Sequence, residues 1–198
     1  MSASQTLLEL AGAAYAPARL RDACLVLIDM QNEYRSGPVA AAGAESAIDV
    51  ARQLLSAARS CRTPVFHVVH KGRPGMLFDR DAERGQIIPA LAPLPGEAII
   101  EKPFPNSFAG TDLHARLSAI GRKDLVLAGF ATHMCISSTA RAAVVHGYRA
   151  TVAADACAAR DLPDGRGGVV PASTVHHVAL VELSDRFAAI ARDHRHLI

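Results

Sequence analysis

Three residues of the sequence carry side chains that could act together in covalent catalysis. Asp29 closes the apolar run ACLVLID, Lys102 follows the short apolar run AII, and Cys135 lies shortly after the run DLVLAGF. If these runs are parallel strands, their carboxyl ends meet at one edge of a sheet, where such folds bind ligands. A thiol beside an acid and a lysine forms a nucleophilic site in which Asp29 acts as general base and Lys102 balances the charge.

Cys135 is the most informative of the four cysteines. It is predicted to begin a helix, and both a helix N-terminus and a nearby lysine favour the thiolate, so we expect a lowered pKa. The alternative is a small buried residue of that helix, which is the usual place of a free cysteine. Cys24 and Cys61 are expected to be structural, whereas Cys157, just beyond a strand end, is a weaker second candidate.

Strand-like and helix-like segments alternate along the chain. Apolar runs predict strands at 23–29, 64–69, 98–100, 124–130 and 149–155, with an edge strand at 187–191. Apolar residues at helical spacing predict helices over about 44–60, 111–121, 135–147 and from 173 onward, with a long loop at 71–97. Strands separated by helices in this way predict an α/β fold, with a parallel sheet covered on both faces.

Length, charge and cysteine spacing exclude several classes of protein. The 198 residues predict one domain over 1–198, with 1–21 as an N-terminal extension. The net charge of +2 is too small for a nucleic-acid-binding surface, and no apolar run reaches the roughly 18 to 20 residues that span a bilayer. Widely spaced cysteines without a CxxC pair favour free thiols in a reducing compartment. We therefore expect a soluble cytoplasmic protein whose partners are neither nucleic acids nor membranes.

Three segments in this order resemble the isochorismatase-like cysteine hydrolases. They are DMQNEY from Asp29, EKPFPNSFAGTDL from Glu101 and GFATHMCISSTARAA from Gly129. With the segments DACAARD and HHVALVELSDRFAAI, the resemblance covers about residues 22–195. It implies a three-layer Rossmann-like fold, with a parallel sheet of order 3-2-1-4-5-6 and helices on both faces.

The same resemblance implies the members of the active site. It makes Asp29, Lys102 and Cys135 a catalytic triad. It also implies a cis peptide bond between Phe130 and Ala131, and an oxyanion hole formed by the backbone N–H groups of Ala131 and Cys135.

For function, the resemblance implies hydrolysis of an amide or related C–N bond of a small molecule, through a thioacyl-enzyme and without a cofactor. The family's nicotinamidase branch binds a metal through an Asp and two histidines, but no histidine lies between Asp29 and Ile48. His67 and His70 are expected on opposite faces of an extended strand, where they are poor mutual ligands. We therefore expect the metal-independent branch and, as in other family members, a homo-oligomer of two or more chains.

Three further residues are candidates for the substrate pocket, namely Gln31, Tyr34 and Phe108. Gln31 could instead orient Asp29 or brace the adjoining loop, and the two aromatic residues could equally belong to the core. His133 and His176 are expected to be structural.

Other classes of function fit the sequence less well. A receiver domain or a phosphatase also uses an acid at a strand end with a lysine, but Gln31 stands where a phosphatase needs a second acid. The segment after Asp29 contains no G-x-G-x-x-G turn for a nucleotide. Two alternatives within the family remain. One is a catalytically idle binding or scaffold protein, and the other is an isochorismatase-type hydrolase of a non-amide substrate, against which Cys135 argues.

Overall fold

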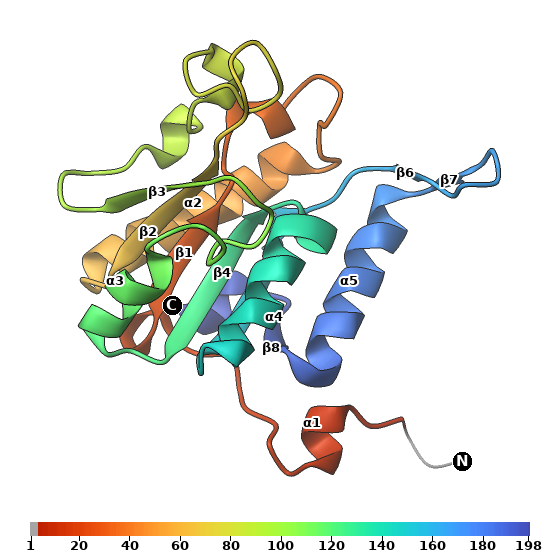
Figure 1. Ribbon diagram of the computed structural model, residues 1–198. Coiled ribbons are helices and arrows are strands. Elements are labelled where there is room, and N and C mark those ends of the chain that lie inside the picture. The colour runs from red at the N-terminus through yellow and green to blue at the C-terminus, as the bar shows by residue number, and fades with distance from the viewer. Residues whose placement is uncertain (1–3) are drawn as a thin grey trace.

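The computed structural model describes residues 4–198, so the first three residues of the predicted extension lie outside it, and its centre is a six-stranded parallel sheet (Figure 1). The strands are β1 (Cys24–Ile28), β2 (Val65–His70), β3 (Ala98–Lys102), β4 (Asp124–Phe130), β5 (Arg149–Ala158) and β8 (Ala188–Ala191). Their order is β3-β2-β1-β4-β5-β8, and every neighbouring pair is parallel. The predicted α/β class and the order 3-2-1-4-5-6 are confirmed, with β8 as the sixth strand of the sheet.

Helices cover both faces of the sheet and make three layers (Figure 1). One face carries α2 (Ala44–Ser60), and the other carries α3 (Leu113–Ile120), α4 (Ser137–Val145) and α5 (Ala172–Arg186). β1 contributes to both cores in alternation, since Leu25 and Leu27 pack in the α2 core and Val26 packs in the opposite core. A strand buried on both faces must be apolar throughout, which explains the continuous apolar run in the sequence.

Shorter elements complete the chain. They are α1 (Leu7–Leu10), the short helical turns Leu20–Asp22, Asn32–Tyr34, Glu83–Gly85, Pro89–Leu91 and His194–Leu197, and a hairpin of β6 (Leu162–Pro163) and β7 (Val169–Val170). α1 lies against α5, and the hairpin projects from the molecule beside the start of α5 (Figure 1). Within residues 4–198, no helix combines the length and the apolar character that crossing a membrane requires.

Two predicted boundaries shift in the structure. The third helix begins at Leu113 rather than near Thr111, because the Thr111 hydroxyl donates to the Ser107 carbonyl at 2.6 Å and holds its own segment in a separate turn. β5 continues to Ala158, past the predicted end at Asp155, because it pairs with β4 again beyond a shift in register.

Candidate active site

The side chains of Asp29, Lys102 and Cys135 meet at the carboxyl edge of the sheet. Lys102 Nζ lies 2.8 Å from Asp29 Oδ2 and 3.4 Å from Cys135 Sγ, and it donates a hydrogen bond to the Phe104 carbonyl at 3.1 Å. The exposed fraction is 0% for Asp29 and for Lys102, and 4% for Cys135. The site is therefore a buried ion pair in contact with a buried thiol.

The topology of the sheet brings these distant residues together. β1 lies between β2 and β4, so Asp29, directly after β1, stands between the ends of both strands, and its N–H donates to the Val68 carbonyl at 2.8 Å. Lys102 ends β3 opposite His70 of β2. Asp29 has a φ of 52°. This conformation is costly for a residue other than glycine and is found where the surrounding structure fixes a functional residue.

Gly129 allows β1 and β4 to approach each other beside this site. Its φ is 133°, and a Cβ atom there would lie 1.9 Å from the Ile28 carbonyl oxygen. Ile28 and Gly129 are also partners in the register of β1 and β4. A side chain at Gly129 would separate the strands just where the chain continues to Asp29 and to the turn that carries Cys135.

Cys135 lies in the helical turn that follows β4 and leads directly into α4, which agrees with its predicted position near the start of a helix. Residues Thr132–Ile136 form one turn of π-helix, and α4 begins only at Ser137. Such turns are often found at functional sites. The peptide bond between Phe130 and Ala131, immediately before the turn, is cis.

Burial, together with the charge of the Asp29 carboxylate, raises the pKa of the Cys135 thiol to about 12 against the lowering effect of Lys102. The prediction of a lowered pKa is therefore wrong, because desolvation and the neighbouring acid outweigh the lysine. Burial also raises the pKa of Asp29, against lowering effects of Lys102 and of a hydrogen bond with the thiol. The thiol therefore keeps its proton at neutral pH, beside the Asp29–Lys102 ion pair.

All four cysteines of the chain are free thiols. Cys61 is exposed at the end of α2, whereas Cys24 and Cys157 are buried, and burial raises their pKa values to about 11 and about 12. Cys157 lies within β5 and not beyond its end. Within residues 4–198, Cys135 is the one thiol that accepts a hydrogen bond from a lysine.

Of the three candidates for the substrate pocket, Tyr34 lies beside the site. Its ring centroid is 5.2 Å from that of Phe130 and 5.3 Å from that of Phe78. Burial raises the pKa of Tyr34, and the nearby Asp29 and Cys135 raise it further. Contact of Tyr34 with a substrate stays a prediction.

The structure favours the alternative expectation for Gln31, which braces a loop. Its fully buried side chain donates to the carbonyls of His70 at 3.0 Å and Gly85 at 2.7 Å, and it accepts from the His70 N–H at 2.8 Å. These bonds occupy the carboxamide and fasten the loop 71–97 to the end of β2. Few hydrogen-bonding positions of Gln31 are left for a substrate.

The packing of Phe108 favours the alternative expectation, that its ring belongs to the core. The Phe108 ring stacks on Tyr148 at 5.9 Å and lies 4.7 Å from His146. Both partners follow the C-terminal end of α4, whereas Cys135 precedes its start. Phe108 therefore packs at the far end of α4 from the thiol.

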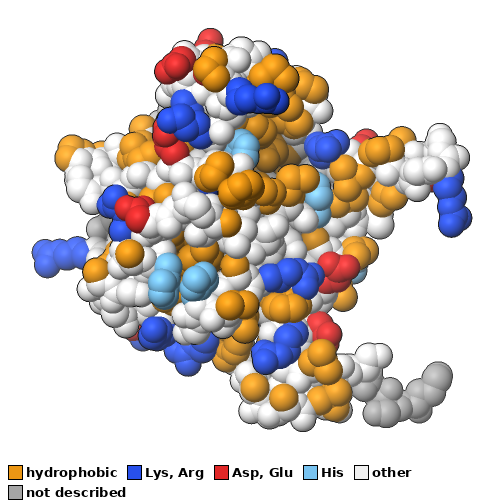
Figure 2. All heavy atoms as spheres, in the orientation of Figure 1, with side chains coloured by type: hydrophobic (Ala, Val, Ile, Leu, Met, Phe, Trp, Pro, Cys, Tyr) orange, Lys and Arg blue, Asp and Glu red, His pale blue; other side chains and the backbone are white. Residues whose placement is uncertain are grey.

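Two exposed apolar residues that were not among the predicted site residues flank the site. Phe104, which accepts the hydrogen bond from Lys102, has an exposed fraction of 56%, and Met134, next to Cys135, one of 42%. Figure 2 shows apolar side chains gathered where the upper loops meet the body of the molecule. Pro103 and Pro105, on either side of Phe104, are the sequence feature that indicates an outward position of its side chain.

His67 and His70 have separate surroundings. His67 Nε2 lies 2.9 Å from Glu97 Oε2, and burial lowers the pKa of His67 against the effect of Glu97. The His70 ring packs edge-on against Phe78 at 5.1 Å.

One group of possible metal ligands exists among the described residues, and it comprises Asp155, Asp193 and His194. His194 Nδ1 is 2.7 Å from Asp155 Oδ2, and His194 Nε2 is 3.2 Å from Gln53 Oε1. Both ring nitrogens of His194 are thus already paired, which fits a structural network between β5 and the C-terminal turn.

The chain is similar to known proteins over most of its length. The Isochorismatase domain family matches residues 23–193. YddQ of Bacillus subtilis (strain 168), an uncharacterised isochorismatase family protein, is 40% identical over 169 residues, which are 84% of this chain and 93% of that protein. Maleamate amidohydrolase of Pseudomonas putida is 32% identical over 149 residues, covering 67% of this chain and 70% of that protein.

A solved structure is similar along nearly the whole chain. The crystal structure of an isochorismatase from Pseudomonas putida KT2440 has a TM-score of 0.96 and 42% identity, and the match covers 99% of this chain and 100% of that chain. The domain match, the related sequences and the common architecture agree. The chain belongs to the isochorismatase family of hydrolases.

Proposed function

We propose that this protein is a cysteine hydrolase that cleaves an amide or a related C–N bond of a small molecule through a thioacyl-enzyme. The observation that carries the proposal is the buried position of Lys102 Nζ, 2.8 Å from Asp29 and 3.4 Å from Cys135. The chain itself thus supplies a nucleophile, a base and a balancing cation, and the proposed reaction needs no cofactor. The similarity to a maleamate amidohydrolase supports an amide as the substrate.

Acylation starts from the protonated thiol. As the substrate carbonyl approaches, the Cys135 proton passes to Asp29 and the sulfur electron pair forms a bond to the carbonyl carbon. The carbonyl oxygen becomes an oxyanion, which accepts hydrogen bonds from the N–H groups of Ala131 and Cys135. The C–N bond then breaks, and the amine leaves with the proton held by Asp29.

Deacylation uses the same groups in the same order. Asp29 takes a proton from a water molecule, whose oxygen attacks the thioester carbon. The C–S bond breaks, the sulfur regains its proton from Asp29, and the carboxylic acid is released. Lys102 keeps Asp29 and the sulfur in a balanced environment, because one negative charge faces its ammonium group wherever the proton rests.

The raised pKa values of the site agree with this division of roles. A thiol with a pKa of about 12 is a weak nucleophile at neutral pH until a base removes its proton. Burial raises the pKa of Asp29, and a carboxylate with a raised pKa is a stronger base. In the proposed mechanism the thiolate therefore forms only during the reaction, by transfer of the Cys135 proton to Asp29.

A screen of small carboxamides for ammonia release tests the proposal. Wild type is compared with Cys135→Ala and with Cys61→Ala, in which an exposed cysteine is removed. We expect equal release from wild type and Cys61→Ala, and none from Cys135→Ala. Turnover that survives in Cys135→Ala contradicts the proposal. Binding of amides without turnover by the wild type favours the idle scaffold, and cleavage confined to non-amide substrates favours the isochorismatase-type alternative.

We also propose that the enzyme works in a reducing cytoplasm as a homo-oligomer. Four free thiols support the compartment. Exposed apolar residues support the assembly, namely Val178 and Val181 of α5, with exposed fractions of 47% and 50%, and Val169 of the projecting hairpin, with 63%.

A further inference from the structure

Thr132 ties the turn that carries Cys135 to two neighbouring elements. It directly follows Ala131 and is fully buried. Its hydroxyl donates a hydrogen bond to the Ala158 carbonyl, at the end of β5, over 3.0 Å, and it lies 2.8 Å from Nδ1 of His176 in α5. The position of the turn thus depends on β5 through one bond and on α5 through the other.

The single proton of the Thr132 hydroxyl decides the direction of the second bond. Because that proton is donated to the Ala158 carbonyl, the hydroxyl oxygen can only accept a hydrogen bond from His176, whose Nδ1 must carry a proton. Burial lowers the pKa of His176, and the charge of His177 lowers it further. His176 is therefore a neutral ring with Nδ1–H as its donor and Nε2 as an acceptor.

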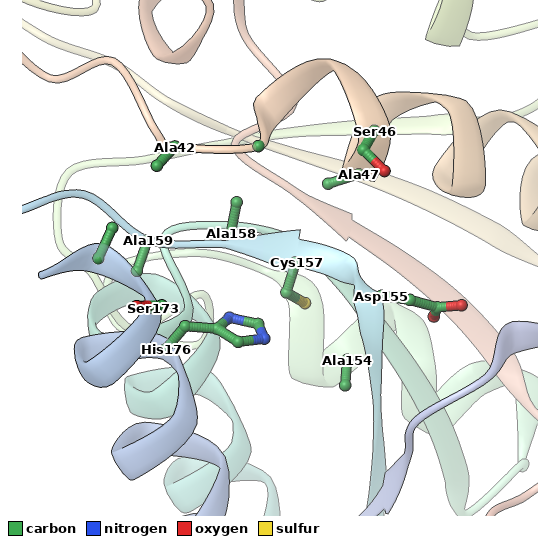
Figure 3. A pocket seen from close by; sticks show the side chains of 12 residues that line it. Ala42, Ser46, Ala47, Ala154, Asp155, Cys157, Ala158, Ala159, Ser173 and His176 are labelled. Carbon is green, nitrogen blue, oxygen red and sulfur yellow. The ribbon is translucent and has the colours of Figure 1, made fainter.

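His176 also stands on the wall of a pocket that does not include Cys135. This pocket has a volume of about 340 Å³ and lies between the start of α2, the end of β5 and the start of α5. The side chains of His176 and Cys157 reach into the same space between α5 and β5 (Figure 3). Within residues 4–198, the bond to Thr132 is the one hydrogen bond of this ring. One side of the ring therefore faces open space, and the bond to Thr132 sets its orientation.

We infer that His176 is a positioning residue for acylation, which acts through Thr132 to fix the turn that carries Ala131 and Cys135. The inference rests on the proposed function, because that function assigns the two oxyanion donors to this turn. Thr132 stands between the two donors in the chain. Without the donor of His176, the buried Thr132 hydroxyl loses one of its two partners, and the turn can move away from β5 and α5. Oxyanion donors act over short distances, so a displacement of about 1 Å slows acylation by about a hundredfold.

Two replacements of His176 separate this role from simple packing. His176→Asn places an amide N–H where Nδ1–H stood and keeps a donor for Thr132. His176→Gln carries its amide out to the position of Nε2 and leaves Thr132 without that donor. His177→Leu, at the exposed neighbouring position, is the matched control.

The rate of acylation is measured with 4-nitrophenyl acetate, whose burst of 4-nitrophenolate reports acyl transfer, with Cys135→Ala as the blank. We expect His176→Gln and Thr132→Val each to lower the acylation rate constant by about tenfold to a hundredfold, at an unchanged half-saturation concentration. His176→Asn keeps most of the wild-type rate, and His177→Leu keeps all of it. The double variant Thr132→Val, His176→Gln is no slower than Thr132→Val, because both changes remove the same bond.

The other possible results contradict either the positioning role of His176 or the proposed function. Equal rates in the Asn and Gln variants, or rate losses that follow the loss of thermal stability in every variant, assign His176 to packing. A burst that depends on Cys135 but is unaffected in all His176 variants overturns the positioning role and leaves the proposed function standing. The absence of any Cys135-dependent release of 4-nitrophenolate by the wild type overturns the proposed function, and the positioning role with it.

Discussion

The position of one proton governs the active site at the scale of single residues. Lys102 contacts both Asp29 and Cys135, and all three side chains are almost entirely removed from water. In these surroundings the thiol keeps its proton, because burial disfavours the ionised form and ionisation would also place a second negative charge beside Asp29. In the proposed reaction, Asp29 is therefore the group that activates the nucleophile.

Replacing Asp29 with asparagine removes the proton acceptor and preserves the size of the side chain. We expect the rate of turnover to fall by about 10²-fold or more. We also expect the free energy of unfolding to fall by about 3 to 5 kcal/mol, since Lys102 loses its buried partner. Kinetics and urea unfolding measure the two effects, with Asp22→Asn at an exposed acid as control. A rate close to that of the wild type refutes the base role. Inhibition of the wild type by a chelator, reversed by zinc, would instead assign the protein to the metal-dependent branch of the family.

The raised pKa of Cys135 also predicts how stability depends on pH. The thiol ionises near 9.0 in the unfolded chain and at about 12 in the folded protein, so the unfolded state loses its proton first as the pH rises. The contribution of Cys135 is therefore complete below pH 9.0 and is lost between about pH 9 and pH 12, at about 1.4 kcal/mol per pH unit. Cys135→Ser has no thiol to ionise, so its free energy of unfolding, measured with urea, should decline less steeply at alkaline pH. Parallel declines in both proteins contradict the raised pKa.

At the scale of secondary structure, the close approach of β1 and β4 sets the geometry of the site. Both the residue after β1 and the turn after β4 carry groups of the proposed active site, and Gly129 is the contact between the two strands. The turn Thr132–Ile136 then places Cys135 before α4. Small changes at this contact are therefore expected to affect catalysis as well as stability.

Gly129→Ala tests the role of this contact. Its Cβ would overlap the Ile28 carbonyl, so we expect a loss of about 3 kcal/mol or more in the free energy of unfolding, together with the loss of activity. Gly121→Ala is the matched control. Gly121 also has a positive φ, of 80°, but its Cβ would meet no atom within 4 Å, so a loss of about 1 kcal/mol is expected. Similar losses in the two variants would mean that backbone conformation alone, without strand contact, explains the effect.

At the scale of the whole molecule, local pattern was enough to predict the layered fold. A strand buried on both faces appears in the sequence as a continuous apolar run, and a helix shows apolar residues at helical spacing. The alternation of strands and helices can therefore be predicted without knowledge of any contact. The start of the third helix at Leu113 depends on the turn around Thr111, which the pattern does not specify. The thiol pKa was misjudged because burial and the contact with Asp29 are properties of the folded chain. The choice between core and pocket for Phe108 stayed open for the same reason, since its partners His146 and Tyr148 are brought to it by α4.

The proposed assembly into a homo-oligomer belongs to the scale of the whole molecule and rests on exposed apolar side chains. Light scattering should give a mass that is a multiple of the 20.9 kDa chain. The double variant Val178→Glu, Val181→Glu should have a lower mass, because it would place carboxylates in an apolar interface. Leu94→Glu, at an exposed apolar residue of the 71–97 loop, is the control. A wild-type mass of 20.9 kDa at all concentrations contradicts assembly.

The most direct test of the central claim is to locate the acyl group after a brief reaction with 4-nitrophenyl acetate. Peptide mapping by mass spectrometry compares the wild type, Asp29→Asn and Cys61→Ala. If Cys135 is the nucleophile and Asp29 its base, the acetyl group appears on the peptide containing Cys135 in the wild type and in Cys61→Ala, and it is nearly absent in Asp29→Asn. An acetyl group found only on the exposed Cys61, or equal acetylation of Cys135 in Asp29→Asn, would contradict the account.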